Sequence, residues 1–225
     1  MEPLAFIHLE MTYEDVTLEA KKLFLTVLGG FHPSKGDMIE EKHQTILILG
    51  PDEPEFWLAF KKSNEFSEHL KDPLDLWSKR IVNALAHEVN AEALFPFNGP
   101  PYAPFYSWSL RTQRIYQSPM KLLVHDKSGL FVSFRGALGF SEHIALPPIK
   151  GHTCKNCDAP CSTACPVDAF AGGTYDVATC KSHITSADRK KCLSNGCAAR
   201  HACPISQNSG RLKEQSAFHM KAFVT

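Results

Sequence analysis

All eight cysteines of this 225-residue chain fall between residues 154 and 203, and none precedes them. The first four are closely spaced and end in Cys165-Pro166, and the last of the other four forms a second such pair, Cys203-Pro204. A proline after a cysteine fixes the backbone φ angle and removes a donor, so the chain turns there instead of continuing a helix. Eight thiols in so short a segment point to metal ligation or to disulfides, and either one fixes how the segment folds.

Several kinds of site use clustered cysteines. A four-iron cluster takes four thiolates, several from a tight loop and one from a distant cysteine that folds back, and the first quartet has this form. Zinc suits paired Cys-x2-Cys units, of which the chain has one, Cys154 to Cys157. Disulfides are usual in small secreted chains, but residues 1–10 lack the basic flank of a signal peptide. The sequence favours two iron-sulfur clusters; one cluster with spare thiols, zinc, and disulfides are the alternatives.

The cysteine segment resembles the two-cluster ferredoxin module of the epoxyqueuosine reductase family, in which a corrinoid-binding domain precedes the clusters. The first quartet, the stretch from Tyr175 to Cys180 and the Gly196-Cys197 pair carry this resemblance. It implies two [4Fe-4S] clusters whose ligands cross between the quartets, as is typical of two-cluster ferredoxins. Carried over by position, the resemblance assigns one cluster to Cys154, Cys157, Cys161 and Cys203, and the other to Cys165, Cys180, Cys192 and Cys197.

Two spacings depart from the pattern of that family. One extra residue lies between Cys157 and Cys161. The second quartet has gaps of 11, 4 and 5 residues, where the family has a compact Cys-x2-Cys-x3-Cys-Pro. We therefore expect Cys192 to replace the ligand that is missing between Cys197 and Cys203.

The residues before the cysteines are predicted to form an α+β fold of α/β character. Thr12 is a good N-cap and begins a helical apolar pattern that Gly29-Gly30 ends. The apolar run at residues 45–49 predicts a strand that is covered on both faces. We expect helices over residues 13–28, 54–70, 73–89 and 105–116, a further strand over 93–97, and a hairpin whose strands cover 121–125 and 130–134.

The apolar pattern stops at Leu146-Pro147-Pro148, which predicts a domain boundary. Residues 1–148 are predicted to be a cofactor-binding or partner-binding domain. Residues 149–206 are then a small ferredoxin-like domain with two clusters, and residues 207–225 a C-terminal tail that either docks on the body or stays mobile.

Charge and hydropathy exclude two classes of partner. The chain has 24 basic and 24 acidic residues, so it lacks the positive field that gathers phosphate backbones, and we expect no nucleic-acid partner. Nowhere do 18 apolar residues run together, so we expect no membrane span. These features predict a soluble, cytoplasmic protein.

A second candidate site is the aromatic and proline-rich loop between the strand and helix predicted on either side of residues 98–104. Ligands of α/β proteins bind in such loops, and Tyr102, Tyr106 and Trp108 could lie against a flat ring. The simpler interpretation is a stiff loop that packs the cluster module onto the first domain. For an anionic ligand group, the candidates are Arg111, Arg114 and Arg135, although isolated arginines more often form surface ion pairs.

The resemblance places Asn98 where the reductase family carries an acidic general acid. An amide cannot donate a proton to a leaving oxygen at neutral pH, so we do not expect epoxyqueuosine reduction itself. If the domain keeps the family's cofactor role, its cofactor is cobalamin or a flavin, with Asn98, Tyr102 and the three arginines as binding residues.

These observations predict an iron-sulfur redox protein that relays single electrons through two [4Fe-4S] clusters to a cofactor or substrate at the N-terminal domain. The resemblance implies an oxidoreductase with a redox partner protein. One alternative is a non-catalytic, ferredoxin-like electron carrier whose N-terminal domain is a docking scaffold. Another is a zinc-stabilised interaction module.

Overall fold

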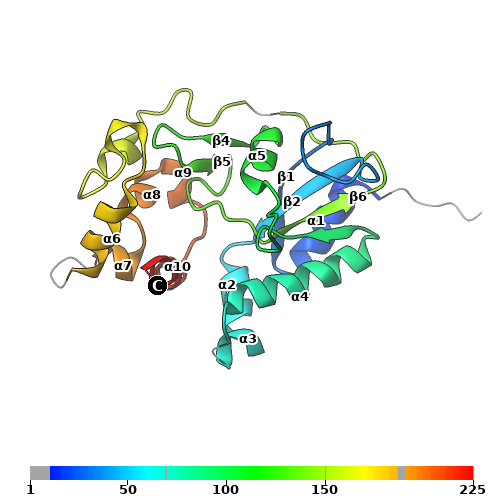
Figure 1. Cartoon of the computed structure of the whole chain (residues 1–225), viewed down its shortest axis with the longest axis horizontal. Helices are drawn as coiled ribbons and strands as arrows, with labels where there is room; N and C mark the ends of the chain where they lie inside the picture. Colours follow the sequence, from blue (N-terminus) through cyan, green and yellow to red (C-terminus); the bar gives the residue numbers. More distant parts are fainter. Residues whose placement is uncertain (1–10, 69, 150, 187–190, 225) are drawn as a thin grey trace, which may run out of the picture.

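The computed structural model describes residues 11–68, 70–149, 151–186 and 191–224. A sheet with its covering helices forms one half of the molecule, and the short helices of the cysteine segment form the other (Figure 1). Helices and strands are mixed within the chain, so the fold is α+β, as predicted. Residues 1–10, on which the signal-peptide argument depends, lie outside the described residues.

The first helix begins as predicted and ends earlier. In α1 (Tyr13–Lys22), the Thr12 hydroxyl accepts from the Asp15 N–H at 3.2 Å, and Asp15 bonds back to the Thr12 N–H at 3.1 Å. The predicted continuation to residue 28 is wrong, because the chain turns at Phe24 and enters β1 (Leu25–Phe31). Val27 therefore enters the core from a strand.

The predicted buried strand is confirmed as β2 (Thr45–Pro51), an inner strand of an antiparallel sheet of order β1-β2-β6-β3. Its neighbour β6 (Gly136–Phe140) also pairs with β3 (Glu92–Leu94), where a strand over 93–97 was expected. Leu47 and Leu49 of β2 belong to one apolar cluster, and Ile46 and Ile48 to another. Because alternate side chains of a strand point to opposite faces, both faces of the sheet are covered.

Helices cover the two faces of the sheet. On one face, α4 (Pro73–Glu88) buries Trp77 and Leu85 as predicted, together with residues of α1 and α2 (Glu55–Lys61). The helix expected over 54–70 is divided, because the Ser63 hydroxyl caps a separate α3 (Asn64–Ser67). On the other face, α5 (Phe105–Arg111) ends before residue 116, because β4 (Ile115–Gln117) begins there.

The predicted hairpin of residues 121–134 is wrong. Its first half is β5 (Leu123–His125), which pairs with β4, while residues 130–134 form no strand. The backbone of Leu130 is bonded elsewhere: its N–H donates to the Ser206 hydroxyl at 2.8 Å, and its carbonyl accepts from Arg200. The cysteine segment thus supplies the partners that a second hairpin strand would have supplied.

The cysteine segment folds into short helices. They are η1 (Pro160–Thr163), η2 (Ala171–Gly173), α6 (Val177–Thr185), α7 (Lys191–Asn195), α8 (Ala198–Ala202) and α9 (Pro204–Gln207). The residues expected to form a tail continue into α10 (Lys213–Val224), which lies beside α7 (Figure 1). Phe218 of α10 packs on Trp57 and Phe60 of α2, with ring centroids 5.3 and 5.8 Å apart, so the tail docks on the body. Among the described residues, no helix combines the length and the apolar character that crossing a membrane requires.

Candidate metal centre

The structure brings together four thiols from the two ends of the cysteine segment: Cys154, Cys157, Cys161 and Cys203. Burial raises the pKa of the Cys154 thiol, and the neighbouring thiols of the other three raise it further. Cys161 and Cys203 are each 6% exposed and pack in one apolar cluster with Leu130 and Val124. The first three positions therefore meet a partner that lies more than forty residues later in the chain.

The other four thiols line one small cavity of about 20 Å³: Cys165, Cys180, Cys192 and Cys197. Burial raises the pKa of the Cys180 thiol, and the thiols of this set add to that rise. Cys192, which the family pattern does not contain, lies on α7 and faces the same space as Cys180 of α6. His183 and Ile184 complete the wall on the α6 side.

Backbone turns place these thiols. Cys203 has an extended conformation between α8 and α9, with Pro204 at the first position of the new helix, so the chain changes direction at the thiol. Cys197 likewise stands at the N-cap of α8. Asp176 caps α6 by accepting from the Thr179 N–H at 2.9 Å, which fixes the helix turn that carries Cys180.

Three thiols of the second set have hydrogen-bond donors. The Ala169 N–H donates to the Cys165 sulfur at 3.3 Å. The Tyr175 hydroxyl donates to Cys180, and the Ala198 N–H donates to Cys192. Donors aimed at sulfur stabilise the thiolate and tune the electronic properties of any metal that it binds.

Four thiolates in one place repel each other, so each set can lose its protons only if a cation neutralises it. None of the eight cysteines, all of which are described, is in a disulfide. Within the described ranges, no three His, Cys, Asp or Glu side chains converge closely enough to hold a single metal ion. A four-iron cluster spreads its ligands over four metal atoms, and two sets of four thiols fit that donor requirement.

The five residues predicted to bind a cofactor are not brought together. Asn98 and Tyr102 line a pocket of about 300 Å³ beside β3. Arg111 and Arg114 line a different pocket of about 580 Å³, and each is paired, Arg111 with Asp37 and Arg114 with Asp126 at 2.9 Å. The side chain of Arg135 lies in neither pocket.

The predicted aromatic platform of the loop is incomplete. Trp108 is 2% exposed, and its indole N–H donates to the Asp37 carbonyl at 2.7 Å, so it belongs to the core. Tyr102 and Tyr106 are exposed, as the prediction requires. The structure therefore offers two of the three aromatic rings to a ligand.

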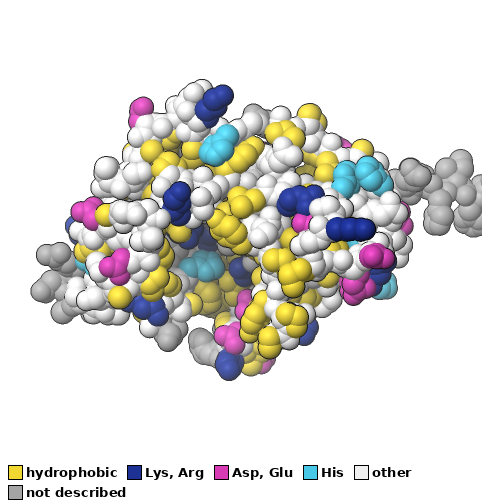
Figure 2. Space-filling view, turned by 45° about the horizontal axis from the view of Figure 1, so that its top comes forward, with side chains coloured by type: hydrophobic (Ala, Val, Ile, Leu, Met, Phe, Trp, Pro, Cys, Tyr) yellow, Lys and Arg dark blue, Asp and Glu magenta, His cyan; other side chains and the backbone are white. Residues whose placement is uncertain are grey.

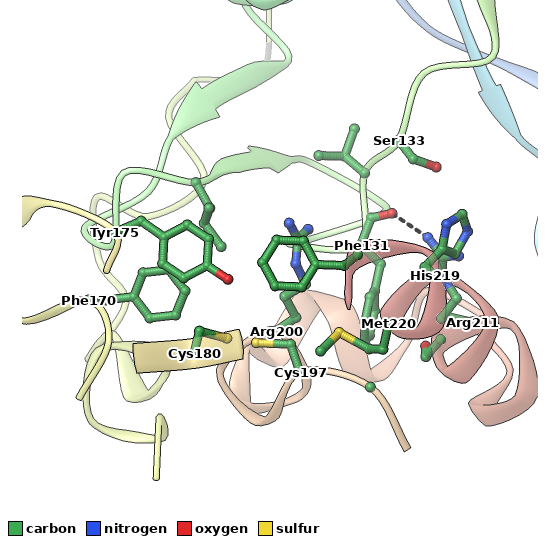
Figure 3. A pocket seen from close by; sticks show the side chains of 15 residues that line it. Phe131, Ser133, Phe170, Tyr175, Cys180, Cys197, Arg200, Arg211, His219 and Met220 are labelled. Carbon is green, nitrogen blue, oxygen red and sulfur yellow. Dashed lines mark hydrogen bonds between the residues drawn. The ribbon is translucent and has the colours of Figure 1, made fainter. Parts of the chain in front are cut away.

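A further cavity, of about 290 Å³, lies between the cysteine segment, α10 and residues 131–133. Cys180 and Cys197 form part of its wall, opposite Arg211 and His219 (Figure 3). Sequence reasoning missed this cavity because its residues come from separate parts of the chain. The available signal was the mixture of charged and aromatic residues in the tail, which includes Arg211, His219 and Phe223.

Comparison with known proteins gives one remote likeness. The chain matches no protein-family model and no curated protein. It is similar to a solved structure described as the crystal structure of selenomethionine-labelled epoxyqueuosine reductase. The two share 13% sequence identity with a TM-score of 0.45, over 90% of this chain and 68% of that chain.

Proposed function

We propose that this protein is an iron-sulfur redox protein that carries single electrons through two [4Fe-4S] clusters to a cofactor or substrate at its N-terminal domain. One cluster is assigned to Cys154, Cys157, Cys161 and Cys203, and the other to Cys165, Cys180, Cys192 and Cys197. The observation that supports this assignment is the division of all eight thiols into two sets of four: the thiols of the first set are near enough to raise the pKa of Cys154, and those of the second set line one cavity. A bound [4Fe-4S] cluster supplies reversible one-electron chemistry.

The surroundings of the thiols serve this role. Met120, Val124 and Leu130 belong to one apolar cluster with Cys161 and Cys203, the two buried thiols of the first set. Hydrogen bonds from Tyr175 and from two backbone N–H groups reach sulfurs of the second set. Burial and hydrogen bonding to sulfur are two of the means by which a protein sets the reduction potential of a cluster.

The second set lies closer to a ligand cavity than the first. Cys180 and Cys197 border both the small thiol-lined cavity and the 290 Å³ cavity, whose opposite wall includes Phe131 to Ser133 of the N-terminal half. We therefore propose that electrons leave the protein on this side. In this scheme the second set is the donor to whatever occupies the larger cavity.

Metal content tests the proposal. Protein purified without oxygen is expected to contain about eight iron atoms and as many acid-labile sulfides per chain, with a broad brown absorption that dithionite bleaches. A Cys192→Ser variant, measured in parallel, should lose about half of the iron. Colourless protein that contains zinc and no iron would refute the proposal.

Cofactor titration separates an enzyme from an electron carrier. A shift in the absorption spectrum of added cobalamin or flavin supports an oxidoreductase with that cofactor. If both spectra stay unchanged at micromolar protein, the non-catalytic carrier with a docking scaffold is the better description. The iron content decides between this pair of functions and the zinc-stabilised module.

A further inference from the structure

We propose that the 290 Å³ cavity binds an aromatic organic molecule through its anionic oxygen group, a phosphate or a carboxylate. The cavity is open to one side of the molecule, and Figure 2 shows a recess between the two halves with basic and histidine side chains at its floor. Its volume is at the lower end of the range for small-molecule sites.

Three buried polar atoms on the cavity wall lack partners. They are Arg211 Nη1, Ser216 Oγ and His219 Nε2, and none has a hydrogen bond to any described residue. The Arg211 side chain is 4% exposed, and its Nη2 already donates to the Phe131 carbonyl at 2.8 Å (Figure 3). Buried polar atoms nearly always have partners. Three unpaired polar atoms on side chains that line one cavity therefore point to an acceptor that binds there.

The charge around the cavity favours an anion. The guanidinium groups of Arg135, Arg200 and Arg211 are close enough to influence His219, whereas the acidic groups beside them are Glu53 and Asp75. Three guanidinium groups beside two carboxylates leave an excess of positive charge among these side chains, while a cluster on Cys180 and Cys197 would add negative charge at the opposite wall. Arg135 also lacks acceptors, because its buried Nε and Nη1 have no hydrogen-bond partner in the described part of the chain. A bound anion would offset its positive charge.

His219 is suited to donate to such an anion. Burial, followed by the charges of the three arginines, lowers the pKa of His219 to about 2, so its ring is neutral at physiological pH. A neutral imidazole carries one N–H. With that proton on Nε2, the ring becomes a third donor beside Arg211 and Ser216.

The remaining wall fits a flat apolar body. The rings of Phe170 and Tyr175 stack with centroids 4.7 Å apart, and Phe131 faces them across the cavity (Figure 3). No acidic residue is among the described residues that line the cavity. An aromatic body would lie against these rings while its anionic group reaches the donors on α10.

Binding at this site does not require that the clusters form. Electron transfer to the bound molecule, however, rests on the proposed function. A molecule held here lies beside Cys180 and Cys197. It is therefore placed to exchange electrons with the second cluster if that cluster is present.

Calorimetry on the full, iron-loaded and oxidised chain tests the inference. The probes are phenyl phosphate, benzoate, inorganic phosphate and phenol. One of the two aromatic anions is expected to bind at least tenfold more tightly than phenol, since a buried charged hydrogen bond is lost with phenol. The tighter of the two identifies the head group. The same anion is also expected to bind more tightly than inorganic phosphate, which cannot use the aromatic wall.

Variants locate the site. Ser216→Ala and Arg211→Lys are each expected to weaken the binding of the tighter anion about tenfold. Arg80→Gln, on the outer face of α4, removes an arginine that is paired with Glu65 and should leave affinity unchanged. Thermal melting of each variant verifies that it is folded, and the small Ser216→Ala change serves if Arg211→Lys does not fold.

Two results overturn the inference. One is the absence of anion binding by iron-loaded protein, which leaves the electron-relay proposal intact. The other is wild-type affinity in folded Ser216→Ala and Arg211→Lys proteins. Conversely, anion binding by protein that cannot take up iron refutes the electron-relay proposal and leaves this site standing.

Discussion

Tyr175 contributes a single hydroxyl to the second thiol set, and its effect can be isolated. The hydroxyl donates to the Cys180 sulfur. Burial raises the pKa of Tyr175, and this hydrogen bond and the nearby thiols raise it further. A donor to sulfur stabilises the reduced, more negative state of a cluster. Tyr175→Phe should therefore lower the reduction potential of one cluster by about 40 mV, the equivalent of about 1 kcal/mol in a one-electron couple.

Potentiometric titration followed by electron paramagnetic resonance measures this shift. Tyr106→Phe is the matched control, because Tyr106 is exposed and its hydroxyl accepts from Gln117 instead of facing a thiol. The potential of the other cluster should stay constant in both variants. Equal potentials in wild-type and Tyr175→Phe protein would show that the Tyr175 hydroxyl does not influence the reduction potential.

Cys192 is the least expected of the eight proposed ligands, and its role can be tested by substitution. The resemblance has no cysteine at this spacing, but the structure places Cys192 against the same cavity as Cys165, Cys180 and Cys197. Cys192→Ser should reduce iron from about eight to about four atoms per chain and abolish one of the two paramagnetic signals. Cys203→Ser should abolish the other signal.

Full iron content and an unchanged spectrum in Cys192→Ser would show that the cluster does not need Cys192, either because another side chain replaces it or because it was never a ligand. His183 is then the first candidate, because it lines the same cavity from α6. The double variant Cys192→Ser, His183→Ala would decide between a substitute ligand and a cluster that never used this position.

Among the elements, α9 depends on a close approach to the turn after β5. Gly129 has a φ of +58°, and an added Cβ would collide with the backbone nitrogen and the hydroxyl of Ser206 within α9. Gly129→Ala should therefore push α9 and Cys203 away from Leu130, at a cost of about 1 to 3 kcal/mol from overpacking.

Gly151→Ala is the control for this change, because Gly151 also has a positive φ, of +88°, but has no atom within 4 Å of an added Cβ. Chemical denaturation and the rate of iron release should separate the two variants. If both lose stability equally, backbone strain is responsible and the contact with α9 contributes nothing.

The strand β2 could be predicted from its own residues, whereas the hairpin could not, because its second half bonds to the cysteine segment. The strand β2 was identified because five consecutive residues form an apolar run, which is typical of a strand buried on both faces. The prediction of a hairpin at residues 121–134 was wrong because the backbone of Leu130 bonds to Arg200 and to Ser206. Both partners lie at least seventy residues further along the chain. No local pattern contains that information.

At the scale of the whole molecule, metal should hold one half together and leave the other unaffected. The sheet half has a large core around Trp77, Phe56 and Leu85. In the described part of the cysteine segment, the buried apolar residues are few and small: Cys161, Ala169, Ile184, Ala199 and Cys203. Such a segment gains much of its folding free energy from bound metal.

Removing iron with a chelator should therefore make residues 151–207 sensitive to protease while the sheet half stays resistant. Mass spectrometry of limited digests, with and without iron, measures the difference. Uniform resistance after iron removal would show that the segment folds on its own contacts, and rapid cleavage in the sheet half would show that metal stabilises both halves.

The candidate site shows the same limit of sequence reasoning at this scale. The resemblance supplied the two sets of cysteines, which the structure brings together, although their role as cluster ligands stays a prediction. The five predicted cofactor residues are dispersed because arginines such as Arg111 and Arg114 have nearby acidic partners. Arg200, Arg211, Ser216 and His219 meet in one cavity only after α10 docks, which a linear pattern cannot reveal.

The crossing of the two thiol sets makes the segment indivisible. Cys165 lies in the first run of cysteines but faces the second set, and Cys203 ends the second run but faces the first. A cut anywhere between them leaves each fragment with thiols whose partners are on the other fragment. An engineer who wants a one-cluster version of this protein must therefore delete scattered side chains rather than shorten the chain, and a duplicated half-segment could not have served as a working ancestor unless two copies exchanged ligands.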